Sequence, residues 1–353
     1  MSGHKIATAE ASPNIALIKY WGKRDDKLFL PLNGSLSVTL DAPIKTRTTV
    51  LFSEQLKKDE FWLNGRRQTE EESADVVRVL NLLRSDESRS RALVVSFNSF
   101  PSSAGLASSA SGIAALTLGG AHALNLKLDP QALSIIARQG SGSACRSIMG
   151  GFVEWTKGAH QDGRDSYAVQ IEPHTFWPEI RILIAIVTSQ KKEVSSRVGQ
   201  TRTVKTSSLF LQRLKEVDKH LSAVKELIAR KDTENLFLEV MRESNNLHAV
   251  MMDSWPPFFY LNDVSRNIIR AVMEFNSGSI KAAYTFDAGP NAFIITTDDC
   301  ANELKNQISR ISGVEEVLES KVGEGPKILQ DDSSHLIDVN AMIPVSLSPK
   351  QAM

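Results

Sequence analysis

The sequence predicts an α+β fold, in which strands and helices are mixed without strict alternation. Residues 5–100 consist mostly of stretches rich in β-branched and apolar residues, with one helical segment among them. Residues 206–275 instead contain three segments whose apolar residues recur at helical spacing. A doubly wound parallel sheet requires strands and helices in regular alternation, so this order favours the α+β class.

The elements of the first half follow from local patterns. Stretches rich in β-branched and apolar residues predict strands at 45–52 and 92–97, and a Gly-Gly turn leads into a strand at 150–155. Apolar side chains at helical spacing predict helices at 70–83, 104–124 and 130–138. The helix at 104–124 is Ala-rich and almost wholly apolar, so we expect it to be buried.

The second half begins with an apolar strand at 181–187, which we expect to open a second lobe. Two long amphipathic helices at 206–230 and 233–252 and a shorter one at 264–275 follow. Strands are predicted at 282–286 and 292–297, around a Gly-Pro turn. The expected division is an N-terminal lobe at 1–180, a C-terminal lobe at 181–325 and a polar, surface-lying extension at 326–353.

The composition is that of a globular protein and excludes several classes of function. Lys and Arg total 41 and so do Asp and Glu, so no overall positive field attracts nucleic acid. The longest apolar runs are too short to cross a bilayer, and the first residues lack the apolar core of a signal peptide. Cys145 and Cys300 imply no disulfide framework, and the reducing cytoplasm is the expected location.

The segment 101–112 holds five Ser, two Gly and one Pro directly before an apolar run. Small residues let backbone amides approach an anion, and the first turn of a helix presents unpaired N–H groups and the positive end of its dipole. One interpretation is therefore a phosphate cradle at a helix N-terminus. The other is a Ser-rich turn with a Ser N-cap, which is common.

The segment 14–25 places Lys19 in an otherwise apolar stretch. If residues 14–20 form a strand, Asn14, Ala16, Ile18 and Tyr20 share one face and Lys19 points to the other. A buried Lys requires a charged partner or a ligand. The alternative is an edge strand with Lys19 in solvent, which the spacing alone slightly favours.

Three further stretches combine polar groups with turns. Residues 138–146 offer the hydroxyls of Ser141 and Ser143 and the planar fork of Arg146, which suits carboxylate or phosphate. Asp287 lies where an apolar strand meets a Gly-Pro turn, as an Asx-type cap or as a catalytic carboxylate. Residues 190–197 form a basic, Ser-containing stretch that is, taken alone, typical of a solvated loop.

Several familiar motifs are missing from the sequence. No G-x-x-x-x-G-K-[ST] occurs, so the Ser-rich loop is not a Walker A loop, and no G-x-S-x-G elbow supports a serine hydrolase. The seven His show neither H-x-x-x-H spacing nor pairing with Cys, so no zinc site is supported.

Taken together, these stretches resemble the mevalonate diphosphate decarboxylase family of the GHMP kinase superfamily. The loop at 101–112 is similar to the superfamily's ATP-phosphate loop, Pro-x-x-x-Gly-Leu-x-Ser-Ser. The segments that resemble the decarboxylase branch specifically are 14–25, 140–146, 150–155 and 286–291. Weaker similarity extends over about residues 5 to 340. The resemblance implies a GHMP-kinase-like fold of two lobes with a deep cleft between them.

The resemblance also implies a reaction of the mevalonate pathway of isoprenoid biosynthesis. ATP would phosphorylate the C3 hydroxyl of mevalonate 5-diphosphate, and loss of phosphate and CO2 would leave isopentenyl diphosphate. Asp287 matches the catalytic aspartate that orients or deprotonates this hydroxyl. Arg146 matches the arginine that holds the substrate carboxylate, and Lys19 matches a lysine beside the reacting centre.

The remaining expected site residues are carried over from the same resemblance. Those around the substrate are Asn14, Tyr20, Lys23, Ser141, Gly142, Ser143, Ser196 and Arg197. Those around ATP are Ser96, Pro101, Ser103, Ala104, Gly105, Leu106, Ser108 and Ser109. Mg²⁺ is expected with ATP, through ligands that the sequence does not identify. Relatives imply a homodimer.

The sequence departs from the family pattern at two places. After Trp62-Leu-Asn-Gly65, where many relatives carry an Arg or Lys that reaches the terminal phosphate, this chain has the acidic run 69–75. Gln200 replaces a usual Met. These differences keep mevalonate 5-monophosphate open as the substrate. A mevalonate 3-kinase and a non-catalytic GHMP-fold binding protein are disfavoured, because Lys19, Arg146 and Asp287 are all present.

Overall fold

The computed structural model describes residues 5–85, 89–100, 108–187 and 193–346, and its mixed sheets and helices confirm the predicted α+β class. Within these ranges the N-terminal half is built on a six-stranded sheet. Its strands in spatial order are β16 (Lys327–Leu329), β1 (Lys5–Ala11), β6 (Thr46–Ser53), β9 (Arg91–Asn98), β7 (Glu60–Leu63) and β8 (Arg66–Arg67). Only the β7–β9 pair among them is parallel.

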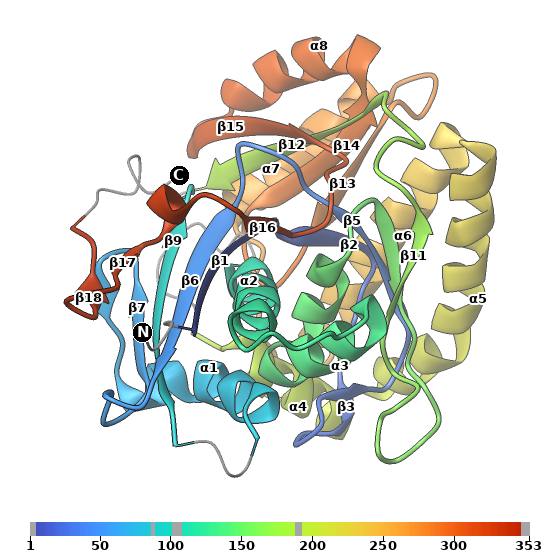
Figure 1. The fold of residues 1–353 in the computed structure, drawn as a ribbon. Coiled ribbons are helices and arrows are strands. Elements are labelled where there is room, and N and C mark those ends of the chain that lie inside the picture. The colour runs from blue at the N-terminus through green and yellow to red at the C-terminus, as the bar shows by residue number, and fades with distance from the viewer. Residues whose placement is uncertain (1–4, 86–88, 101–107, 188–192, 347–353) are drawn as a thin grey trace.

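Three helices pack on this part of the molecule. They are α1 (Glu70–Leu83), α2 (Ser108–Ala123) and α3 (Pro130–Gly140). Helix α2 lies over β1 and β6, in the centre of the view in Figure 1, and its Ala- and Gly-rich face allows a close approach to the sheet. The helix is buried, as its apolar sequence predicts.

A second sheet joins the two halves. Its order is β11 (Ala168–Glu172), β10 (Phe152–Trp155), β5 (Ser35–Thr39) and β2 (Asn14–Ile18), and all its pairs are antiparallel. The two-stranded ribbon of β3 (Lys23–Asp25) and β4 (Leu30–Pro31) and the 3-10 helix η2 (Gly142–Ile148) lie beside it. Strand β2 is at the edge, yet all five of its residues are buried.

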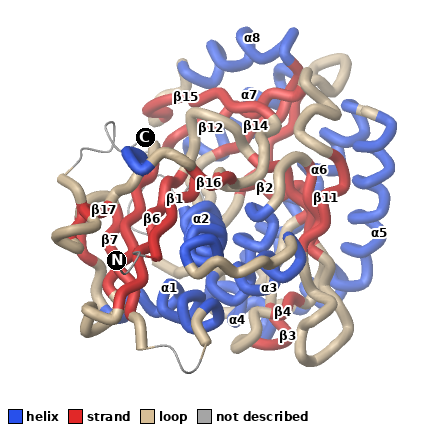
Figure 2. Tube along the Cα trace, viewed as in Figure 1, coloured by secondary structure: helices blue, strands red, loops and turns tan. Residues whose placement is uncertain are grey.

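The C-terminal half is built on a third antiparallel sheet. Its order is β13 (Ala282–Phe286), β14 (Ala292–Thr297), β12 (Ile180–Val187) and β15 (Val314–Lys321). Its helices are α4 (Ser196–Thr206), α5 (Ser208–Arg230), α6 (Thr233–Met252), α7 (Asp263–Phe275) and α8 (Asp298–Ser309). Helices α5 and α6 lie on the side of the molecule opposite β7 and β17 (Ile337–Asp338) (Figure 2).

One hydrophobic core connects the second and third sheets. Ile15 and Val38 of the second sheet share a buried cluster with Leu183 and Ile294 of the third. A separate buried cluster lies between α1, α2 and the first sheet. Because α6 packs against both β2 and β13, the residues that follow these two strands are held near each other.

The predicted elements are largely present, with four differences. Residues 206–230 form one helix only from Ser208, because Ser207 caps α5 with its side chain and ends α4. Helices α4 and α8 and strand β15 were not predicted. Their sequences are polar on their outer faces, and packing against neighbouring elements rather than local pattern stabilises them.

The C-terminal segment was predicted as a polar surface extension, and the described part of it is more integrated than that. Strand β16 adds to the edge of β1. Beyond it, Leu336 and Ile337 are buried against Leu51 and Phe97, and the short strands β17 and β18 (Ile343–Pro344) pair with each other. Two apolar residues are enough to dock a polar segment, which composition alone does not reveal. The division at residues 180 and 325 stays a prediction.

Candidate active site

A cavity with a volume of about 610 Å³ lies between the two halves. Its wall comes from segments far apart in sequence. They include residues after β2, the first turns of α1 and α2, the start of η2, the start of α4 and the turn after β13. A cavity of this size suits a small-molecule ligand.

Lys19 and Asp287 meet in the wall of this cavity. The Lys19 Nζ donates a hydrogen bond of 2.7 Å to Asp287 Oδ1. Lys19 is only 2% exposed, whereas the Asp287 side chain is 37% exposed. Burial lowers the pKa of Lys19, and the adjacent Asp287 carboxylate opposes that effect. The solvated-lysine interpretation is therefore wrong, and Asp287 presents its free oxygen to the cavity.

The expected alternation of faces along residues 14–20 is also wrong. Strand β2 ends at Ile18, and a register shift occurs between Ala16 and Ile18. Beyond the strand end the side chains no longer alternate, so Lys19 and Tyr20 both line the cavity together with Asn14.

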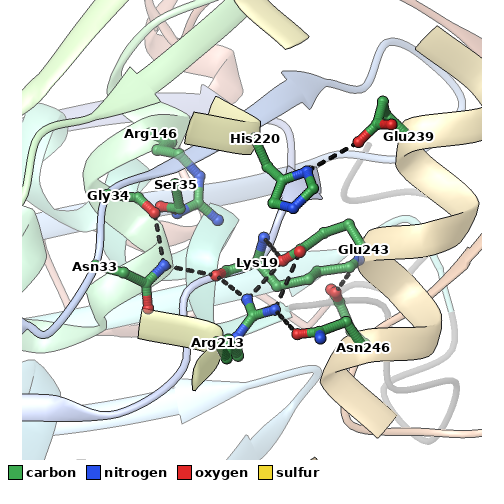
Figure 3. Close-up of polar contacts among 11 residues, drawn as sticks. Lys19, Asn33, Gly34, Ser35, Arg146, Arg213, His220, Glu239, Glu243 and Asn246 are labelled. Carbon is green, nitrogen blue, oxygen red and sulfur yellow. Dashed lines mark hydrogen bonds and ion pairs between the residues drawn. The ribbon is translucent and has the colours of Figure 1, made fainter. Parts of the chain in front are cut away.

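The backbone of Lys19 is held by buried polar side chains from α5 and α6 (Figure 3). Its N–H donates to Glu243 Oε1 at 2.8 Å. Its carbonyl oxygen accepts from Arg213 Nη2 at 3.0 Å and from Asn33 Nδ2 at 2.9 Å. Arg213 and Glu243 form a buried ion pair with each other. Neither residue was predicted, because nothing in a helical sequence pattern distinguishes a buried ion pair from a solvated one.

Arg146 lies in η2, is buried, and lines the same cavity. Its guanidinium donates to Ser35 Oγ at 2.6 Å, to Ser37 Oγ at 2.9 Å and to Asn14 Oδ1 at 3.2 Å. No carboxylate in the described residues lies within ion-pair distance of it. Burial lowers its pKa, but an arginine remains charged at neutral pH. The site therefore contains a cation whose natural complement is an anionic ligand.

Neighbouring residues hold η2 in place. Asn14 Nδ2 donates to Ser143 O at 3.0 Å and to Ser147 Oγ at 2.8 Å. The Ser141 and Ser143 hydroxyl oxygens lie 3.5 Å apart and face the cavity. A Cβ on Gly142 would lie 3.0 Å from the Tyr20 ring, so a side chain there would push the cavity wall apart. The predicted roles of Asn14 and Gly142 are thus compatible with support of the pocket.

A cluster of cations surrounds the Phe29 ring at one end of the cavity. Lys23 Nζ lies 4.7 Å from the ring centroid, and the guanidinium carbons of Arg78 and Arg197 each lie 5.2 Å from it. Lys23 and Arg197 line the cavity, and Ser196 lies beside Arg197 in the first turn of α4. The predicted solvated loop at 190–197 is thus a helix start from Ser196 onward.

Acidic side chains reach the same end of the cavity. Asp75 on α1 accepts a 2.5 Å hydrogen bond from Arg197, and Glu72 also lines the cavity. The acidic run at 69–75 serves mainly as a helix start, since Thr69 and Glu72 form a capping box. A hydrogen bond from Arg66 lowers the pKa of Glu72 to about 2.

The start of α2 and strand β9 form another part of the cavity wall. Ser109 Oγ lies 3.4 Å from Ser141 Oγ, which places the first turn of α2 beside η2. Ser96 lines the cavity, although its hydroxyl is paired with Thr48 at 2.8 Å. Ser108 opens α2. The predicted residues Pro101, Ser103, Ala104, Gly105 and Leu106 lie outside the described residues.

Two family models match the chain, the diphosphomevalonate decarboxylase-like N-terminal domain at residues 11–168 and the mevalonate 5-diphosphate decarboxylase C-terminal domain at residues 182–324. The diphosphomevalonate decarboxylase of Ganoderma lucidum is 45% identical over 84% of this chain and 80% of its own. The human protein of that name is 39% identical over 94% and 95%.

The chain belongs to the diphosphomevalonate decarboxylase family. The mevalonate diphosphate decarboxylase of Staphylococcus aureus superposes with a TM-score of 0.87 at 35% identity, over 93% of this chain and 98% of that one. An Enterococcus faecalis homologue superposes with a TM-score of 0.85 at 38% identity, over 92% and 99%. A structure of MDDEF in complex with MVAPP, AMPPCP and magnesium has a TM-score of 0.86 at 39% identity, over the same shares. The GHMP-kinase-like fold is thereby confirmed.

Within the ranges that the structure covers, no group of three or more His, Cys, Asp or Glu side chains has the arrangement of a metal site. Of the helices described above, none is long and apolar enough to cross a membrane.

Proposed function

We propose that this chain catalyses the ATP-dependent decarboxylation of mevalonate 5-diphosphate, which gives isopentenyl diphosphate, ADP, phosphate and CO2. The observation that carries the proposal is the meeting of Lys19, Asp287 and Arg146 in one cavity between the two halves. The family match and the complex of a similar structure with MVAPP, an ATP analogue and magnesium support the same reaction.

Asp287 is proposed to orient and deprotonate the C3 hydroxyl for attack on the γ-phosphate of ATP. Its Oδ1 accepts the Lys19 hydrogen bond, which leaves Oδ2 free for the substrate hydroxyl. The Lys19 ammonium, only 2% exposed, would lie beside the transferring phosphoryl group and stabilise its charge. Positioning and electrostatic stabilisation supply most of the catalysis in phosphoryl transfer, and both are available here.

Arg146 is proposed to hold the substrate carboxylate. Its hydrogen-bond partners Ser35, Ser37 and Asn14 are neutral, and no carboxylate among the described residues lies within ion-pair distance, so an incoming carboxylate would pair with this buried guanidinium. Once the C3 phosphate departs with its bonding electrons, the C1–C2 bond electrons form the new double bond and CO2 leaves. A carboxylate held beside Arg146 stays oriented until that bond breaks.

ATP is proposed to bind at the part of the cavity wall formed by α2 and β9, where Ser96 and Ser109 line the cavity. The first turn of α2 offers unpaired N–H groups for phosphate oxygens. Mg²⁺ usually keeps several waters and binds through one or two side-chain oxygens plus the nucleotide phosphates, so it fits a site without a carboxylate cluster. The Ser109 hydroxyl and the ATP phosphates would hold it, and it would neutralise charge on the phosphates.

The 5-diphosphate is proposed to lie among Tyr20, Lys23, Ser196 and Arg197, near the Phe29 ring. One observation favours mevalonate 5-monophosphate as a second candidate. Arg197 is already ion-paired with Asp75, and the Asp75 carboxylate would compete with a terminal phosphate for that guanidinium. The shorter substrate places less negative charge near Asp75.

The residue roles, the two-lobe division, a homodimeric state and a cytoplasmic location are proposed on the family resemblance. The test of the reaction is ATP-dependent release of CO2 from mevalonate 5-diphosphate and from mevalonate 5-phosphate, measured in parallel. Release that is faster from the 5-diphosphate supports the proposal. Faster release from the 5-phosphate would make mevalonate 5-phosphate the substrate. No release from either compound would refute the proposed reaction.

A further inference from the structure

Two consecutive residues of α6 bind the backbones that carry the Lys19–Asp287 pair. Glu243 Oε1 accepts from the Lys19 N–H at 2.8 Å. Ser244 Oγ accepts from the N–H of Phe286 at 3.0 Å, and Phe286 directly precedes Asp287. Glu243 and Ser244 are 6% and 1% exposed, so neither bond competes with solvent. One turn of α6 thus accepts hydrogen bonds from the backbone of Lys19 and from the backbone of the residue before Asp287.

Helix α5 supplies a hydrogen bond to the Lys19 carbonyl oxygen. Arg213 Nη2 donates both to the Lys19 carbonyl oxygen, at 3.0 Å, and to Glu243 Oε1, at 2.5 Å. Arg213 Nη1 donates to Glu243 Oε2 at 3.0 Å and to Asn246 Oδ1 at 2.5 Å. Figure 3 shows these side chains converging on the peptide groups on either side of Lys19. The N–H and the carbonyl of Lys19 are therefore both fixed from the C-terminal half.

We propose that Glu243 and Ser244, with Arg213 behind them, are positioning residues that set the separation and orientation of Lys19 and Asp287. The inference rests on the proposed function and adds residues that act through the reacting pair rather than on the substrate. A displacement of about 1 Å in a reacting group can reduce a rate about 100-fold. Lys19 follows an edge strand and Asp287 lies in a turn, so their own elements do not hold them to that tolerance.

A purely structural role explains these contacts less well. Two helices can be packed by apolar side chains, and a buried ion pair is often no more stabilising than such packing. Here the ion pair reaches beyond α5 and α6 to the peptide groups of Lys19, and the neighbouring Ser244 reaches β13. These polar groups thus bind the two backbone segments that carry Lys19 and Asp287, which must be aligned.

Glu243 also acts on Lys19 by charge. The ionisable groups that face Lys19 are Asp287 after β13, Glu243 and His248 on α6, Arg213 on α5 and Arg146 on η2. The negative charge of Glu243 raises the pKa of Lys19 and so opposes the effect of burial. Replacement of Glu243 by the neutral Gln keeps the shape and one acceptor oxygen, removes this charge, and puts an amide NH2 group where Arg213 Nη1 now donates. The pKa of Lys19 must then fall further.

The experiment compares Ser244→Ala and Glu243→Gln with Glu239→Gln. Glu239 lies one turn earlier on α6 and pairs with His220 and Arg242, away from the cavity, so it is a matched control. We expect kcat for CO2 release to fall about 10-fold to 100-fold in both test variants, with KM for ATP within about twofold of wild type. We expect the alkaline limb of kcat to move to lower pH in Glu243→Gln but not in Ser244→Ala. Glu239→Gln should match the wild type.

Hydrogen exchange of the peptides that contain Lys19 and Phe286, followed by mass spectrometry, tests the same inference without activity. Faster exchange at Phe286 in Ser244→Ala, at unchanged thermal stability, supports it. Exchange and kcat equal to those of Glu239→Gln in both test variants would overturn it, as would a loss of kcat that only follows a loss of folded protein. An inactive wild type would refute the proposed function, and the exchange result would still decide whether α6 holds the two backbones.

Discussion

His248 on α6 makes the stability of the apo protein depend on pH in a specific way. The residue is buried, its Nε2 has no hydrogen-bond partner among the described residues, and its ring meets that of Phe286 edge-on. Burial, and then the charge of nearby Lys19, lowers the pKa of His248 to about 4. An unfolded histidine has a pKa of about 6.5. Between these values the unfolded state binds a proton that the folded state does not, so the free energy of unfolding falls as the pH falls.

The size of the effect follows from the two pKa values. Over the whole window from pH 6.5 to pH 4 the loss amounts to about 3 kcal/mol, and about 2 kcal/mol of it is reached by pH 5. At pH 7 the contribution is close to zero. Replacement of His248 by Phe removes the titrating group and keeps an aromatic ring against Phe286. The variant should therefore lose about 2 kcal/mol less than the wild type between pH 7 and pH 5.

The assay is urea unfolding followed by tryptophan fluorescence, at pH 7 and pH 5, for the wild type and for His248→Phe. Other titrating groups contribute equally to both proteins, so only the difference between the two losses is read. His248→Gln serves as a second variant that lacks the ring, and it should show the same pH difference at a lower absolute stability. Equal losses in wild type and variants would show that His248 is protonated in the folded protein and would refute the reasoning.

Three further predictions concern the reaction itself. Asp287→Ala should abolish CO2 release and leave ATP binding, measured by calorimetry, largely intact, because Asp287 acts on the C3 hydroxyl; near-normal turnover would contradict its role. Arg146→Gln should lower kcat/KM for the phosphorylated mevalonate about 100-fold, because a hydrogen-bonded charge pair is lost, and should leave KM for ATP unchanged. An equal rise in both KM values would count against a carboxylate site. Asp75→Asn should release Arg197 from its ion pair and raise the ratio of kcat/KM for the 5-diphosphate to kcat/KM for the 5-monophosphate. Glu71→Gln, a change at an exposed residue of the same helix, should leave this ratio unchanged. An unchanged ratio in Asp75→Asn would show that Asp75 does not take part in substrate selection.

Local patterns in the sequence predicted the elements that build the site. Helix α1 was predicted with the same bounds because its apolar residues recur at helical spacing, and the structure shows in addition that Thr69 caps its start. The strand before Asp287 was predicted because five apolar or β-branched residues precede a Gly-Pro turn. These signals lie within a dozen residues of one another, which is the range over which periodicity and turn chemistry act.

Long-range partners could not be predicted from the same patterns. Nothing near Lys19 in the sequence shows that Asp287, 268 positions away, will pair with it. Glu243 and Arg213 look like ordinary charges on amphipathic helices, and only the fold shows that they are buried against Lys19. The edge-strand interpretation of residues 14–20 was correct for β2, but it could not foresee that α5 and α6 cover that edge. The family resemblance, not the spacing, assigned Lys19, Arg146 and Asp287 to one site.

The central claim is that this cavity couples ATP to decarboxylation of a 5-phosphorylated mevalonate. The most direct measurement is release of labelled CO2 from C1-labelled mevalonate 5-diphosphate, with and without ATP and Mg²⁺, beside C1-labelled mevalonate 5-phosphate. We expect release only when ATP and Mg²⁺ are present, stoichiometric with ADP and faster from the 5-diphosphate. Formation of ADP without CO2, or no ATP-dependent release from either substrate, would contradict the account.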